Sequence, residues 1–411
     1  MFVLEHRDRQ IYPIKVWLRK PEQIDAGCLE QALRLANLPF LHQWVALMPD
    51  THQGTGMPIG GVIAIKDALI PNAVGVDIGC GMAYVQTDLP AEALMKADTP
   101  NGKLIQAIIG DILRNIPVGF AHHRQKQPCH ALDQAKDRLS RYEFAKDLIP
   151  ELDEGYFQVG TLGGGNHFIE LQEDEDGLVG IMLHSGSRNF GLKICRFFNE
   201  TAKKLNQQMK IALPKEYNLA FLPVDTKEGR SYIEWMNLAL EFARENRELM
   251  LERVMEIVSK WVEKYTEYTI SYSERINCHH NYAALEEHYG REVWVHRKGA
   301  IRAGKDEPGI IPGAMGSFSY LVKGLGNPES FESCSHGAGR KYSRTGAKQR
   351  YSVEEVLNDL KECRVVLGKH KKSDVAEESR FAYKDIDLVI QNELDLVKPV
   401  KKLRTVGVVK G

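Results

Sequence analysis

The sequence has no long apolar run, and none approaches the ~18 residues that a membrane-spanning helix needs. Its first residues also do not place a basic segment before an apolar one, as a secretory signal would. These two absences argue against a membrane protein and a secreted protein. We therefore expect a cytoplasmic protein with no membrane partner.

An excess of charge of one sign is also absent. Lys and Arg total 54 and Asp and Glu total 55, so the chain lacks the basic surplus of proteins that bind nucleic acids without sequence preference. A nucleic-acid substrate would require a local basic cleft. The seven cysteines are an odd number and form no Cys-x-x-Cys pair, which argues against structural disulfides and a zinc ribbon.

The 411 residues are 43% hydrophobic and 27% charged, which is typical of an enzyme with a large core, and no repeat or linker divides them. Apolar residues at three- and four-residue steps predict helices, and a Ser-x-x-Glu capping box predicts the start of another. Short apolar runs between glycine clusters predict strands. The pattern therefore indicates a mixed α and β fold. Helices are expected over 103–115, 192–209, 232–264 (one helix or two in tandem) and 352–363, and strands over 61–66, 82–89 and 293–297.

The stretch HFIELQE-DEDG-LVGIMLH predicts a β-hairpin, because two apolar runs flank an acidic turn that ends in glycine. If the turn is centred on DEDG, Glu173 faces Leu178 and His167 faces His184. Directly opposed residues of antiparallel strands have Cβ atoms ~4.5–5.5 Å apart. We therefore expect the two imidazoles to converge at the open end of the hairpin.

Two glycine-rich segments carry candidate ligands. VDIGCGM places Asp77 and Cys80 three residues apart, and GGGNH ends in Asn166 and His167. Glycine permits close approach of the backbone to a ligand, and glycine amides together with an asparagine suit a phosphate. Taken alone, a buried cysteine beside a capping aspartate and an ordinary glycine turn would explain the same residues.

Three further clusters make core packing a poor explanation for so many polar residues. HSGSR contains His184, NCHHN contains His279 and His280, and SHGAGR contains His336. Asp, Cys and His form a mixed ligand set that suits Zn, Mn, Fe or Co, and one thiolate could bridge two ions of a site that acts on phosphoryl groups. A solvated histidine pair is the alternative for NCHHN. His336 could be a ligand, a general base or a nucleophile.

In these motifs the sequence resembles the RtcB-type RNA ligases, which use GTP to join RNA 3′-phosphate ends to 5′-hydroxyl ends. The resemblance covers essentially the whole chain. It implies a single compact α/β (mixed α+β) domain, 1–411, with β-sheets flanked by helices around a central dinuclear metal cleft and a mainly helical insertion around 191–265. The motifs follow in the order MPDTHQGTGMPIGG, VDIGCGM, GGGNHFIE, HSGSR, NCHHN, IPGAMG, SHGAGR, AYKD and the terminal KG.

The resemblance also implies a role for each of the candidate ligands. Two Mn²⁺ ions would share one thiolate, and His336 would be the catalytic nucleophile that becomes guanylylated. Of the two adjacent histidines in NCHHN, His280 matches the family's ligand and His279 is the less favoured candidate. The implied ligands are Asp77, Cys80 and His167 for one ion and Cys80, His184 and His280 for the other.

GTP is the implied nucleotide cofactor, and Glu170 and Lys410 would read its guanine base with Tyr383 nearby. The chain departs from the family pattern at Ala314, where serine is usual, and at Asn189-Phe190, where glycine and an aliphatic residue are common. The first departure puts one hydrogen bond to the nucleotide in question. The implied guanylate contacts are Asn166, His167, Phe168, Ile169, Glu170, His280, Asn281, Pro312, Gly313, Ala314, Met315, Ser319, His336, Gly337, Ala338, Gly339, Arg340, Tyr383 and Lys410.

The implied activity joins RNA 3′-phosphate or 2′,3′-cyclic phosphate ends to 5′-hydroxyl ends through a His–GMP and then an RNA(3′)pp(5′)G intermediate, in tRNA splicing or RNA repair. Two other classes stay open: a metal-dependent phosphodiesterase that uses no nucleotide, and a non-enzymatic RNA-binding factor, which the balanced charge disfavours. His336 and Lys410 favour the ligase, because a plain metal hydrolase needs neither. The sequence predicts no particular activating protein partner.

Overall fold

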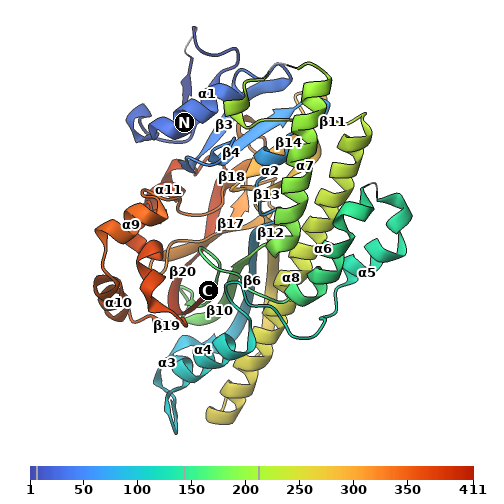
Figure 1. The fold of residues 1–411 in the computed structure, drawn as a ribbon. Coiled ribbons are helices and arrows are strands. Elements are labelled where there is room, and N and C mark those ends of the chain that lie inside the picture. Colours follow the sequence, from blue (N-terminus) through green and yellow to red (C-terminus); the bar gives the residue numbers. More distant parts are fainter. Residues whose placement is uncertain (6–7, 143, 212) are drawn as a thin grey trace.

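The computed structural model describes residues 1–5, 8–142, 144–211 and 213–411. Two sheets lie at its centre (Figure 1). The smaller sheet has the strand order β1-β2-β3-β4-β14-β13. These strands span Phe2–Leu4 (β1), Ile14–Val16 (β2), Leu41–His52 (β3), Ile59–Ile65 (β4), Arg291–Lys298 (β14) and Asn281–His288 (β13).

The larger sheet has the order β12-β6-β10-β9-β20-β17-β16, and β19 runs parallel to β20. Its register brings together chain segments that are far apart in the sequence. Gly81 at the start of β6 pairs with Ser185 of β10 and with His279 of β12. The strands span Tyr272–His279 (β12), Gly81–Pro90 (β6), Leu178–Ser185 (β10), Phe168–Glu173 (β9), Val397–Lys410 (β20), Phe318–Gly324 (β17), Pro308–Ile311 (β16) and Val366–Gly368 (β19).

The expected helices and strands are all present, with bounds that differ by a few residues. Residues 232–264 belong to one helix, α8, rather than two in tandem, and Ser352 forms the predicted capping box with Glu355. Helix α8 packs across β6, β10 and β12 and, with α4, covers one face of the larger sheet. These helices span Lys227–Tyr265 (α8), Leu104–Asn115 (α4), Arg188–Gln208 (α7) and Val353–Glu362 (α10).

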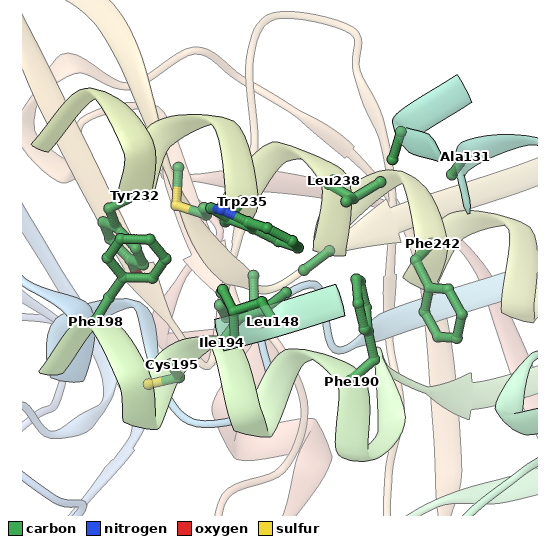
Figure 2. Packing of buried hydrophobic residues seen from close by; sticks show 14 of the residues in the cluster. Ala131, Leu148, Phe190, Ile194, Cys195, Phe198, Tyr232, Trp235, Leu238 and Phe242 are labelled. Atoms are coloured by element: carbon green, nitrogen blue, oxygen red, sulfur yellow. The ribbon is translucent and has the colours of Figure 1, made fainter. Parts of the chain in front are cut away.

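A layer of helices forms a second core on one side of the molecule (Figure 1). Helices α5 (His130–Asp137), α6 (Ala145–Gln158), α7 and α8 pack there through buried apolar side chains, and Figure 2 shows aromatic rings of α7 and α8 among them. Phe190 of α7 lies 5.0 Å from Phe242 of α8, ring centre to ring centre. Phe190, one of the two residues at which the chain departs from the family pattern after HSGSR, therefore packs in the core. Within the described ranges, each helix is too short or too polar to cross a bilayer.

Shorter elements complete the fold. Small two-stranded ladders join β5 to β11, β15 to β18 and β7 to β8. They span Ala68–Leu69 (β5), Leu222–Pro223 (β11), Ala300–Arg302 (β15), Ser333–Ser335 (β18), Asp98–Thr99 (β7) and Gly102–Lys103 (β8). The remaining α-helices span Ala26–Leu35 (α1), Pro71–Val74 (α2), Ala91–Lys96 (α3), Arg344–Arg350 (α9) and Ile386–Asn392 (α11).

The predicted hairpin exists as β9 and β10, but its register differs from the expected one by one residue. Glu173 pairs with Val179 rather than with Leu178. The cause lies in the turn, where the N–H of Asp174 donates to the carbonyl of Leu178 at 2.9 Å. This closes a loop of three residues that ends in Gly177 with φ +76°, an arrangement common for three-residue hairpin loops.

Candidate active site

The thiol of Cys80 and three imidazoles meet where the strands of the larger sheet end. Cys80 precedes β6, His167 precedes β9, His184 lies in β10 and His280 follows β12. The Sγ of Cys80 lies 3.4 Å from the Nε2 of His167 and 3.2 Å from the Nε2 of His184. The Nε2 atoms of His184 and His280 are 3.4 Å apart. The donors of Cys80, His167 and His184 all lie within 4.8 Å of one another.

The two hairpin histidines converge although they are not paired. His184 pairs with Phe168, so the expected pairing with His167 is wrong by one residue. The ring centres of His167 and His184 are nevertheless 5.0 Å apart. His167 lies just before the strand, so the alternation of faces along a strand does not fix its direction.

Backbone carbonyls orient these imidazoles. The Nδ1 of His167 lies 2.9 Å from the carbonyl of Leu162, and the Nδ1 of His184 lies 3.1 Å from that of Asn166. Carbonyls only accept, so each Nδ1 carries the proton and each Nε2 presents its lone pair to the thiol. Metal-bound histidines are usually held in this way. The carboxylate of Asp77 completes the group, 3.3 Å from the Nε2 of His167.

Burial sets the charge of the cluster. It raises the pKa of the Cys80 thiol well above its usual range, and nearby Asp77 adds to the effect. Burial lowers the pKa values of His184 and His280 well below the usual range for histidine, and neighbouring histidines lower them further. Two neutral imidazoles are therefore available as ligands. A bound cation would be needed to stabilise Cys80 as a thiolate.

Arg247 of α8 ties the ligand-bearing segments together. Its buried guanidinium donates to the carbonyl of Gly79 at 2.8 Å and to that of Ser185 at 3.0 Å. It also lies 3.0 Å from the Nδ1 of His279. Burial and this guanidinium lower the pKa of His279 to about 3. Since His279 faces the arginine, His280 is the histidine of the pair that faces the donor cluster.

A cavity of about 590 Å³ opens beside the cluster. Most of the residues expected to contact guanylate line it, as does His184. The cavity therefore joins the candidate metal ligands to the candidate nucleotide residues. The expected residues that line it are Asn166, Phe168, Glu170, Pro312, Gly313, Ala314, Met315, His336, Gly337, Ala338, Gly339, Arg340, Tyr383 and Lys410.

A few expected contact residues lie behind the lining. Ile169 alternates with its neighbours along β9, so its side chain lies in the core on the opposite face of the sheet. The hydroxyl of Ser319 accepts from the N–H of Gly313 at 3.1 Å and so supports the cavity wall. Asn281 donates through Nδ2 to the carbonyl of Asp77 at 3.1 Å. His167 and His280 belong to the donor cluster.

His336 faces the cavity with one ring nitrogen held from behind. Its Nδ1 lies 2.6 Å from Oδ2 of the fully buried Asp50, which lies in β3. An ionised carboxylate only accepts, so Nδ1 carries the proton and Nε2 keeps its lone pair. The ring centre of His336 is 4.8 Å from that of His280, so this lone pair lies beside the donor cluster.

Asp50 was not among the predicted site residues, although MPDTHQG contains it. Its contact with His336 also explains Gly339, which has φ +72°. A Cβ at Gly339 would lie 2.1 Å from the carbonyl oxygen of Asp50. Glycine is therefore needed for SHGAGR to approach β3.

Glu378, at the end of a short helical turn, is a second residue that sequence reasoning missed, and no motif marks it. Its carboxylate lies 2.7 Å from the Nζ of Lys410, 3.3 Å from Nη1 of Arg340 and 2.8 Å from the hydroxyl of Tyr383. Burial raises the pKa of Glu378, but Lys410, Arg340 and Tyr383 together outweigh it, and the pKa lies below the usual range. The carboxylate therefore fixes three predicted nucleotide residues.

Glu170 lies close to this group and is held differently. Its Oε2 accepts from Nε2 of Gln172 at 2.7 Å and from the hydroxyl of Thr405 at 3.1 Å. Burial raises its pKa to about 7, although Gln172 and Lys410 act in the opposite direction. Glu170 and Lys410 therefore present a titratable acceptor and a donor to the same cavity.

Comparison with known proteins gives one consistent result. A family model described as "tRNA-splicing ligase RtcB" matches residues 31–411. The chain is 40% identical to an RNA-splicing ligase RtcB of Escherichia coli, with 97% of each chain covered. It is 30% identical to a tRNA-splicing ligase RtcB of Pyrobaculum aerophilum, covering 93% of this chain and 91% of the other. It is 31% identical to an RNA-splicing ligase RtcB of Mycobacterium bovis, covering 93% and 100%.

Proposed function

The chain belongs to the tRNA-splicing ligase RtcB family, and from this premise we propose that it joins RNA 3′-phosphate or 2′,3′-cyclic phosphate ends to 5′-hydroxyl ends, using GTP and Mn²⁺. The observation that carries the proposal is the placement of His336. Its Nδ1 is held by Asp50, and its other ring nitrogen has no hydrogen-bond partner among the described residues and lies beside a cluster of metal-type donors. A hydrolase that relies on metal alone has no need of this arrangement.

The donor cluster fits two manganese ions. One thiol, one carboxylate and three imidazoles form a mixed set of hard and borderline ligands, as Mn²⁺ accepts. When bound, such ions act as Lewis acids that neutralise charge on phosphate oxygens. Asp77, Cys80 and His167 would hold one ion, and Cys80, His184 and His280 the other.

His336 would carry the first chemical step. The lone pair of its Nε2 attacks the α-phosphorus of GTP, so that a P–N bond forms, the bond to the bridging oxygen breaks and pyrophosphate leaves. The ring becomes positively charged as the bond forms. Asp50 holds the Nδ1 proton and stabilises that charge, as a carboxylate does for a catalytic imidazole.

Two further transfers complete the reaction. An oxygen of the RNA 3′-phosphate attacks the phosphorus of His–GMP, which frees His336 and gives RNA(3′)pp(5′)G. Hydrolysis with one water first opens a 2′,3′-cyclic phosphate where that is the starting end. The 5′-hydroxyl then attacks the activated 3′-phosphate, a phosphodiester forms, and GMP leaves with the electron pair of the broken P–O bond.

Glu170 makes nucleotide binding depend on pH. We expect its carboxylate to accept hydrogen bonds from guanine, which requires the ionised form. With a pKa of about 7, affinity for GTP should rise about tenfold from pH 6 to pH 8. Glu170→Gln should remove this rise. The nucleotide phosphates titrate equally in both experiments, so the ratio of the two GTP affinities at each pH reports Glu170 alone. Calorimetric titrations at several pH values measure it.

The raised pKa also affects stability, in the opposite direction. The folded chain retains a proton on Glu170 that the unfolded chain loses at a lower pH, so this group lowers stability as the pH rises toward 7. Glu170→Gln should therefore unfold at equal or higher denaturant concentration than the wild type at pH 8.

For the binding prediction, a wild-type GTP affinity that is flat with pH, relative to that of Glu170→Gln, would contradict the assigned role of Glu170.

The end chemistry is a direct test of the proposed reaction. We expect product from an RNA with a 3′-phosphate and one with a 5′-hydroxyl when GTP and Mn²⁺ are present. We expect none from 3′-hydroxyl and 5′-phosphate ends, and none when ATP replaces GTP. Gel analysis of end-labelled RNA measures both. Cleavage of phosphodiesters without nucleotide, with no joining, would favour the metal-dependent phosphodiesterase instead.

A further inference from the structure

The side chain of Phe120 is fully exposed. Its relative exposure is 101%, and the next most exposed large apolar side chain in the described ranges, Ile11, reaches 69%. Single exposed apolar side chains are common on protein surfaces, so it is the position of this ring, and not its exposure alone, that indicates a role.

The backbone places Phe120 beside the candidate metal site. The N–H of Gly119 donates to the carbonyl of Gly163 at 2.8 Å, and the N–H of Leu162 donates to the carbonyl of Pro117 at 2.9 Å. Nη2 of Arg188 donates to the carbonyl of Gly119 at 2.7 Å. The segment before Phe120 is thus fixed along the GGGN turn that leads into His167.

Basic side chains follow Phe120 in the sequence, and another lies against the GGGN turn. Arg124 is exposed and makes no hydrogen bond or ion pair with any described residue, and His122 beside it is also exposed. The guanidinium of Arg344, which lines the cavity, lies over Gly165 of the turn. Arg124 and Arg344 supply local positive charge, which a chain with nearly equal numbers of acidic and basic residues needs in order to bind a polyanion.

We propose that Phe120 is a stacking platform for a nucleobase of the RNA strand whose end enters the cavity, with Arg124 contacting the phosphate backbone of that strand. The inference rests on the proposed function and assigns it an RNA-binding surface. An aromatic face accepts any base, and single-stranded ends expose their bases for stacking. Such a contact suits a ligase that must seal broken ends of different sequence.

Three variants test the platform. Phe120→Ala should weaken binding of a single-stranded RNA with a 3′-phosphate, and raise the KM for RNA in ligation, by about tenfold. Phe120→Trp should restore both. Covalent labelling by GTP should not change in either variant, which also shows that they fold. Tyr268→Ala is the matched control. Tyr268 is an exposed ring in the segment between α8 and β12, where Ser271 accepts a hydrogen bond from Asp88 near the far end of β6, so its loss should leave RNA binding unchanged.

The outcomes separate this inference from the proposed function. If the wild type ligates RNA and Phe120→Ala binds RNA as tightly as the wild type, the platform is refuted while the ligase stands. The platform is also refuted if Phe120→Ala binds RNA normally but has lost the binding of another protein. If the wild type binds the RNA through Phe120 but neither labels with GTP nor ligates, the proposed function fails alone. Binding measured by fluorescence anisotropy and ligation measured on gels distinguish these results.

Discussion

His336→Ala is expected to form no covalent GMP adduct and to ligate RNA from GTP only at background level. The substitution removes the ring nitrogen that attacks the α-phosphate, and no other imidazole in the cavity has its Nδ1 held by a buried carboxylate as His336 does. The Mn²⁺ content should be unchanged, because His336 is not one of the proposed ligands. Much of the GTP affinity should remain, since Asn166, Glu170 and Lys410 are intact. Labelling, metal analysis and GTP titration measure the three quantities.

The step that fails identifies the role of His336. RNA with a preformed 3′-guanylylated end bypasses the nucleophile, so His336→Ala should still seal it to a 5′-hydroxyl. His130→Ala is the control, because His130 lies exposed on α5 and should behave as the wild type. If His336→Ala still takes up label, the nucleophile lies elsewhere. If the variant also loses Mn²⁺, His336 is a ligand and the proposed mechanism is wrong.

Cys80→Ser is expected to lose both metal ions together. One thiolate is assigned to both ions, and a neutral hydroxyl is a far weaker bridge. The geometry supports a shared ligand, because the Sγ of Cys80 lies 3.4 Å from His167 and 3.2 Å from His184, which are assigned to different ions. Ligation and GTP labelling should fall to background along with the metal. Metal analysis of the purified variant by mass spectrometry measures the loss.

Two further variants make the metal result specific. His184→Ala should chiefly remove the second ion and leave the first, because His184 is assigned to one ion only. Cys363→Ser should retain both ions, since Cys363 follows α10 and lies outside the donor cluster. A Cys80→Ser protein that holds two Mn²⁺ per chain would contradict the shared thiolate.

Local sequence signals predicted most of the elements but not their exact pairing. The capping box of Ser352 and the apolar period of α8 depend on residues a few positions apart, so the sequence alone carries them. The register of β9 and β10 depends on whether the acidic turn closes around three loop residues or four. The conformation of the turn around Gly177 makes that choice, and the DEDG sequence alone does not show which of the two loops forms.

In the candidate site, too, some residues could be predicted from local motifs and others could not. Cys80, His167 and His184 could be grouped because glycine-rich motifs mark them and the hairpin joins two of them. Asp50 reaches His336 across 286 residues of sequence, and its role appears only when β3 passes behind SHGAGR. Glu378 has no motif at all, because its contacts with Lys410 and others are made in three dimensions.

To test directly whether His336 is the nucleophile, the protein is incubated with Mn²⁺ and α-labelled GTP and the label is mapped. We expect an acid-labile label, as a phosphoramidate gives, on the peptide that contains His336, with pyrophosphate released in equal amount. Addition of RNA with a 3′-phosphate should discharge it. Absence of label from an enzyme that still joins the RNA ends, or an acid-stable label on another residue, would contradict the assignment of His336 as the nucleophile.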